Sequence, residues 1–188
     1  MISFSLDVNH IRDKIPGMPS PSAESLAPFP AIALRPERPE DEAFLFAVYA
    51  STREEELAAV GWDTDTRDRF LDLQFRAMRQ GYRAMFPQAQ FAIILLDARP
   101  VGRAVVDRSG AAIHLVDLAL LAPERNRGIG THLLRQWTAE AAHANRPLRL
   151  RVLKGSRTRR LYERLGFIQT ADEGLYEVLE WRLASLIT

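Results

Sequence analysis

The residues best suited to chemistry in this sequence are two glycines, Gly128 and Gly130, placed where a strand is expected to end and a helix to begin. The first N–H groups of a helix lack intrahelical acceptors and lie at the positive end of its dipole. Glycine lets a ligand approach such a backbone without interference from Cβ, so an anion such as a phosphate fits here. The spacing matches neither a P-loop, which needs a lysine after its second glycine, nor a dinucleotide fingerprint, because Leu133 replaces the third glycine. A glycine-assisted turn without a ligand remains the alternative.

Two further side chains have the chemistry for proton transfer. On a helix predicted from Ser156 to Leu165, the two leucines of 161–165 face the core, which turns Tyr162 by roughly a hundred degrees toward a neighbouring gap between strands. The alternative is that Tyr162 is an amphipathic residue at the edge of the core whose hydroxyl is already hydrogen-bonded. Asp117 interrupts an apolar strand and is either a general base or a buried, hydrogen-bonded structural carboxylate. His114 and His132 lack ligand spacing, so we expect no metal site.

These residues must be positioned by elements that periodicity and turn residues predict along the chain. Strands are expected at 31–35, 91–96, 101–106, 112–121, 148–153, 167–169 and 175–181, the last two joined by a turn at 171–174. Helices are expected from Pro39 to about Ser51, at 63–85 with a break near Gly81, at 128–144 and at 156–165. The three central strands form an antiparallel meander. This order predicts an α/β (α+β) fold with a mixed sheet and helices on both faces.

The composition indicates one globular domain. The chain has 188 residues, of which 47% are hydrophobic and 26% charged. Residues 1–30 hold five of the eleven prolines and predict an irregular arm, so we expect the domain at 31–188. No apolar run is long enough to cross a bilayer, no secretory signal begins the sequence, and no cysteine is present. We therefore expect a cytoplasmic protein without a membrane partner.

The charges are unevenly placed along the chain although the net charge is only +1. Residues 37–72 contain eleven acids against four arginines, and residues 146–164 contain eight basic residues against Glu163 alone. For each single charge a solvated surface is the simplest interpretation. The basic block otherwise suits phosphates, with Lys154, Arg157 and Arg160 as candidates.

With Arg125, Gly128 and Gly130 at these spacings, the sequence resembles the GNAT superfamily of N-acetyltransferases, whose signature is Arg or Gln, two residues, Gly, one residue, and Gly or Ala. The preceding turn Pro123-Glu124 agrees with the family pattern. A second block at 161–167 looks like the family's late helix and the strand after it. The resemblance covers roughly residues 31–181 and implies a GNAT-like, mostly antiparallel sheet of six to seven strands.

The resemblance implies acetyl-CoA as the cofactor and assigns roles to individual residues. The N–H groups from Arg127 to Thr131 would hold the pyrophosphate, and the backbone of 118–120 would hold the pantetheine arm, with the Leu120 N–H as an oxyanion donor. Tyr162 matches the family's tyrosine that protonates the leaving thiolate. Ser156 stands where an asparagine is usual and keeps hydrogen-bonding capacity. The implied cofactor-binding residues are Leu118, Ala119, Leu120, Arg125, Asn126, Arg127, Gly128, Ile129, Gly130, Thr131, Ser156 and Arg160.

The resulting prediction is an acetyl-CoA-dependent N-acetyltransferase in which a primary amine attacks directly, without a covalent intermediate. One alternative is a non-catalytic acyl-CoA-binding regulatory module, against which Tyr162 argues. The other is an acyltransferase acting on an RNA-linked amine. The acidic stretch 37–72, expected on the acceptor side, would repel a phosphate backbone, so we do not expect nucleic acid as a partner. That stretch suits a cationic amine, and a homodimer is compatible with the sequence.

Overall fold

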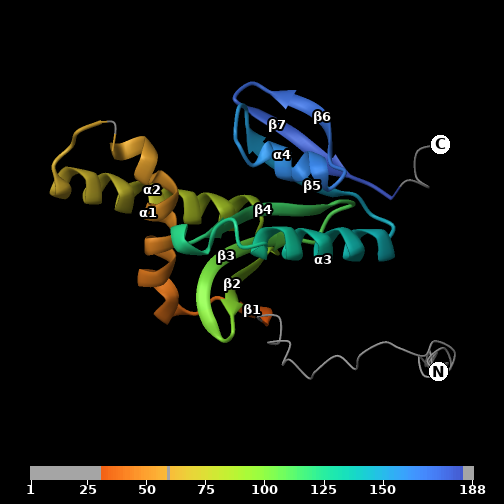
Figure 1. Ribbon diagram of the computed structural model, residues 1–188, viewed down its shortest axis with the longest axis horizontal. Helices are drawn as coiled ribbons and strands as arrows, with labels where there is room; N and C mark the ends of the chain where they lie inside the picture. Colours follow the sequence, from red (N-terminus) through yellow and green to blue (C-terminus); the bar gives the residue numbers. More distant parts are fainter. Residues whose placement is uncertain (1–30, 59, 184–188) are drawn as a thin grey trace, which may run out of the picture.

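The computed structural model describes residues 31–58 and 60–183 (Figure 1). The N-terminal arm expected at 1–30 therefore lies outside the described residues. The strands are β1 (Ile32–Pro36), β2 (Gln90–Leu96), β3 (Arg99–Asp107), β4 (Ile113–Leu120), β5 (Leu148–Leu153), β6 (Ile168–Glu173) and β7 (Tyr176–Trp181). The helices are α1 (Glu42–Ala58), α2 (Thr64–Met85), α3 (Ile129–His143) and α4 (Arg159–Arg164), with short 3₁₀ turns η2 (Pro39–Asp41) and η3 (Ala122–Glu124).

The strands form a seven-stranded sheet in the order β1-β2-β3-β4-β5-β7-β6. Strands β1 to β4 are an antiparallel meander, and β7 pairs in antiparallel fashion with both β5 and β6. The β4–β5 pair is parallel because α3 carries the chain back across the sheet between them. The prediction of a mixed, mostly antiparallel sheet with helices on both faces is confirmed.

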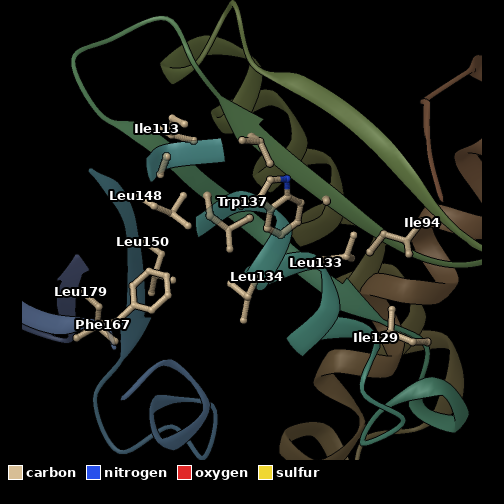
Figure 2. Packing of buried hydrophobic residues seen from close by; sticks show 14 of the residues in the cluster. Ile94, Ile113, Ile129, Leu133, Leu134, Trp137, Leu148, Leu150, Phe167 and Leu179 are labelled. Carbon is tan, nitrogen blue, oxygen red and sulfur yellow. The ribbon is translucent and has the colours of Figure 1, made fainter. Parts of the chain in front are cut away.

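The two faces of the sheet are covered by different helices (Figure 1). On one face, α3 buries Leu133, Leu134 and Trp137 against Ile113 and Leu148 of the central strands, as Figure 2 shows. On the other face, residues of α1 and α2 form a second cluster around Leu45, Tyr49, Leu71 and Phe75, which contacts Ile93 of β2. This two-sided burial follows from the alternation of side chains along each strand. The sheet therefore separates two helix layers, each with its own hydrophobic cluster.

Three local details differ from the sequence prediction. Helix α1 continues past Ser51 to Ala58, and α2 runs unbroken through Gly81. One glycine costs a helix only about 1 kcal/mol, and α2 is held by its Asp63 cap and by buried Leu71 and Phe75. In the last hairpin, residues 171–173 belong to β6, so the turn contains only Gly174 and Leu175. Gly174, at φ 77°, allows so tight a connection.

No helix in the part of the chain that the structure describes combines the length and the apolar character needed to cross a membrane.

Candidate active site

The site begins where β4 and β5 separate. The two strands pair only from Ile113 to Leu115 and from Leu148 to Leu150. Directly after this stretch, Val105 pairs with Asp117 while Val106 pairs with Leu115, which leaves Val116 as an extra residue in a β-bulge. A bulge bends its strand and ends regular pairing. Beyond it, a cavity of about 180 Å³ lies between β4 and β5.

The edge of β4 turns backbone groups toward this gap. The N–H of Leu121 donates to the carbonyl of Val101 at 3.0 Å, and antiparallel pairs alternate between bonded and non-bonded positions. The backbone groups of Leu118 and Leu120 therefore point away from β3 and toward the gap. Gly102 makes the close approach of β3 to β4 feasible, because a Cβ there would lie 2.4 Å from the carbonyl oxygen of Ala119.

Tyr162 closes the cavity from α4. It lines the gap together with Ser156, Thr158 and Leu118, and its ring packs edge-on against Phe167 at 5.7 Å between centroids. Among the described residues its hydroxyl has no recorded hydrogen-bond partner. Burial, and secondly the charge of Asp117, raises the pKa of Tyr162 to about 12. The phenol is therefore a protonated donor that faces the gap throughout the physiological range.

The glycine loop has an unusual run of free donors. The first backbone bond of α3 joins the N–H of His132 to the carbonyl of Gly128 at 2.9 Å. Before it, the N–H groups from Asn126 to Thr131 have no recorded acceptor in the described part of the chain. Asn126 and Gly128 have positive φ angles of 61° and 83°, and alternating turns of this kind form concave, anion-binding backbones. The loop has the geometry that an anionic ligand needs.

Arginine side chains hold this loop in place. Arg125 donates to the Leu120 carbonyl at 3.1 Å and to the Ser51 carbonyl at 2.9 Å, which ties the loop to both β4 and α1. Arg127 and Arg99 both pair with Glu124, whose side chain is buried. The signature arginine therefore positions the loop with its side chain, and the backbone of the loop is what remains free for a ligand.

Asp117 faces the gap between β4 and β5 and also pairs with a side chain of the neighbouring strand β3. Its Oδ2 accepts from Nε of buried Arg103 at 2.6 Å, and it also lines the β4–β5 cavity. Burial raises the pKa of Asp117, and the paired guanidinium opposes that shift only in part. The carboxylate is thus structurally paired, which is one of the two roles that the sequence left open. Its role as a general base stays a prediction.

A second cavity, of about 630 Å³, opens on the α2 side of the same gap. The two cavities share Leu115, Val116, Leu150 and Arg151, so they meet where β4 and β5 part. Tyr82 at the end of α2 lines the second cavity, and burial followed by the charge of Asp117 raises its pKa to about 12. Sequence reasoning missed this residue, because in the sequence Tyr82 was one more apolar position of a helix.

The acidic stretch 37–72 lies on α1, on the first part of α2 and in the segments before these helices. In the described part of the chain, none of its acids lines either cavity. Glu37 binds Arg79 and Arg83, Asp41 binds Arg35, and Asp63 caps α2. These carboxylates hold α1, α2 and the start of the sheet together.

Of the other predicted residues, some line the β4–β5 cavity and others do not. Ser156 lines the β4–β5 cavity, with its hydroxyl 2.7 Å from that of Thr158. Ala119 is buried in β4, and Arg160 is exposed on α4 and lines neither cavity. The structure therefore brings together Leu118, Ser156 and Tyr162, with the glycine loop joined to the end of the same strand.

Comparison with known proteins agrees with this geometry. A family model described as the GNAT acetyltransferase domain matches residues 87–169. No curated protein matches the sequence. Among solved structures, the PaiA N-acetyltransferase of Thermoplasma acidophilum in complex with coenzyme A is 16% identical and has a TM-score of 0.61, covering 81% of this chain and 99% of its own.

Two further solved structures share the fold. An acetyltransferase of Thermus thermophilus is 18% identical with a TM-score of 0.59, covering 82% of this chain and 99% of its own. A GNAT family acetyltransferase of Elizabethkingia anophelis with acetyl-CoA bound is 14% identical with a TM-score of 0.50, covering 81% of this chain and 98% of its own. The GNAT resemblance read from the glycine loop and the late helix is confirmed.

Proposed function

We propose that this chain, which carries a GNAT acetyltransferase domain over residues 87–169, transfers an acetyl group from acetyl-CoA to a primary amine by direct attack. Two structures that share its fold contain CoA or acetyl-CoA, and this supports the same cofactor here. A bound acetyl-CoA would supply an activated acyl group on a thiol that can leave. Every other part of the chemistry falls to the residues of this chain.

The observation that carries the proposal is the run of N–H groups from Asn126 to Thr131, which find no acceptor in the described part of the chain, in the loop that follows β4, the strand that lines the gap with Tyr162. Anions bind such helix starts because the N–H groups and the helix dipole act together. The loop would hold the pyrophosphate, and Leu118 and Leu120 would offer backbone groups along the gap. The cofactor's reactive end would then lie near Tyr162, as direct transfer requires.

The transfer forms a C–N bond and breaks a C–S bond. The Leu120 N–H, which faces the gap, is placed to donate to the thioester carbonyl as negative charge develops on its oxygen. Tyr162 would give a hydrogen bond and then a proton to the departing sulfur, and water would restore that proton. The ring of Phe167 holds the tyrosine ring in place.

The amine must lose a proton as it attacks. Asp117 lines the β4–β5 cavity and has a raised pKa, so it is the strongest candidate for the base, either directly or through a water molecule. Arg103 keeps the carboxylate oriented toward the centre of the sheet. The amine would thus lose its proton to Asp117, while the departing thiolate gains a proton from Tyr162 of α4.

The proposal is tested by incubating the protein with acetyl-CoA and a panel of primary amines and measuring free thiol release. We expect amine-dependent release above the rate of hydrolysis, with the acetylated amine identified by mass. Binding of CoA measured by calorimetry, without thiol release for any amine, would favour the non-catalytic binding module instead. Failure to bind CoA would overturn both.

A further inference from the structure

The second cavity has a chemical character that bears on which amine is accepted. One side of it is aromatic or apolar, with Tyr82, Phe86, Tyr176 and Val178 among its lining residues. Its floor is β5, from which Arg149 and Arg151 point to the same side because they are two residues apart on a strand. A ligand in this cavity would meet an apolar wall and two guanidinium groups.

Both arginines retain binding capacity. Arg149 uses its Nε for Glu180, whose carboxylate is also bound by Arg182, and the terminal nitrogens of Arg149 have no recorded acceptor among the described residues. Arg151 lies 2.8 Å from Glu173, in a pair whose side chains are 57% and 45% exposed. Exposed pairs of this kind contribute little, so a ligand anion can replace Glu173 at small cost.

The balance of charge in the cavity is positive. Among the described residues that line it, Glu173 is the only carboxylate. The histidine of the lining, His114, has its pKa lowered by burial and next by the charge of Arg149, with Asp107 and Glu180 acting in the opposite sense. A lowered pKa favours the neutral imidazole, so the positive charge of the cavity comes from its arginines and not from His114. The cavity thus favours an anion over the cationic acceptor expected from the acidic stretch.

We propose that the acceptor is an amine that carries a carboxylate on an apolar body, with the carboxylate bound by Arg151 and Arg149 and the body held among Tyr82, Phe86 and Tyr176. This inference rests on the proposed acetyl transfer. Arg151 lines both cavities, so the carboxylate would lie close to the attacking nitrogen, as it does in an α-amino acid. Arginine is suited to this role because its planar fork matches a carboxylate with two parallel hydrogen bonds.

The test compares L-phenylalanine, L-methionine and L-leucine with the amide of each, which lacks the carboxylate, at equal concentrations of the unprotonated amine. With acetyl-CoA and the thiol-release assay, we expect kcat/KM for the acids to exceed that for the amides by roughly tenfold or more. The variant Arg151→Met should remove most of this preference. Glu173→Gln should increase it, because it removes the competing carboxylate.

The matched control is Arg135→Met, which removes the same charge from an exposed position on α3, on the opposite face of the sheet. It should leave the preference unchanged. Arg149 is not replaced in this test. The side chain of Glu180 is only 2% exposed and pairs with both Arg149 and Arg182, so removing Arg149 would leave a buried carboxylate with one partner fewer. Amides used as well as acids, or a preference that survives Arg151→Met, would overturn the inference while the acetyl transfer itself stands.

A binding measurement keeps the inference testable if no amine in the panel is acetylated. Calorimetry with CoA present compares the affinity for L-phenylalanine with that for L-phenylalaninamide. Tighter binding of the acid that is lost in Arg151→Met upholds the carboxylate site even if the transfer reaction fails. Equal affinity of the two probes for the wild-type protein overturns it.

Discussion

At the scale of single residues, the decisive feature is that the charge of Asp117 acts on two half-buried tyrosines, one in each cavity. Burial, and secondly the charge of Asp117, raises the pKa of both Tyr162 and Tyr82. Both phenols are therefore protonated throughout the physiological range. A base on one side of the gap and an acid on the other is the separation that aminolysis of a thioester needs.

Replacing Tyr162 by phenylalanine tests the acid. The ring and its contact with Phe167 remain, while the proton is lost, so turnover should fall by roughly a hundredfold and the affinity for acetyl-CoA should hardly change. Steady-state kinetics and calorimetry measure the two quantities. The loss should shrink with a thioester whose thiol leaves more readily. Wild-type turnover in the variant would reduce Tyr162 to a packing residue.

Replacing Asp117 by asparagine tests the base through the pH profile. The proposed mechanism requires the ionised carboxylate, so in the wild-type protein we expect kcat/KM to fall as pH decreases through the raised pKa of Asp117. The asparagine variant should lose this acidic limb and keep only the rise that deprotonation of the amine causes. Because Arg103 then loses its partner, the melting temperature is measured as a control. An unchanged acidic limb would assign proton removal to water.

At the scale of elements, the β-bulge at Val116 and the short parallel pairing of β4 with β5 create the site. A longer ladder would pair the backbone groups of Leu118 and Leu120 and close the cavity. Gly102 contributes from β3, since any side chain there would push β4 away. The site thus depends on where one strand pair stops.

The glycine loop is tested by a matched pair of variants. Gly128 lies at φ 83°, a conformation that asparagine and aspartate both tolerate better than other residues, and a Cβ there meets nothing within 4 Å. Gly128→Asn should therefore retain much of the CoA affinity, whereas Gly128→Asp places a negative charge against the pyrophosphate and should weaken it at least tenfold further. Calorimetry measures both. Equal affinity in wild type and Gly128→Asp would remove the loop from the binding site.

At the scale of the whole molecule, the sheet separates two helix layers, and the proposed substrates approach from different sides. The α3 layer presents the glycine loop, and the α2 layer presents the larger cavity. In the described part of the chain, the β4–β5 cavity and the larger cavity share lining residues where β4 and β5 part. This arrangement would let acceptor and cofactor bind without competing for the same surface.

The N-terminal arm is tested by truncation. Residues 1–30 contain five prolines and no apolar period, so deletion of residues 1–25 should leave the melting temperature nearly unchanged. Thermal unfolding followed by circular dichroism measures this. A drop of many degrees would mean that the arm packs on the domain, and the amine panel would then show whether it covers the acceptor cavity.

The sequence by itself determined the strand and helix order, the glycine loop and the position of Tyr162, because periodicity, caps and turns depend on neighbouring residues. Only the tertiary structure decided the pairing of Asp117 with Arg103 and the placement of Tyr82, Arg149 and Arg151 around the second cavity. These depend on strand register and on contacts between distant segments. The acidic stretch shows the difference, since its charges were plain in the sequence but their arginine partners, such as Arg79 and Arg83 for Glu37, were set by packing.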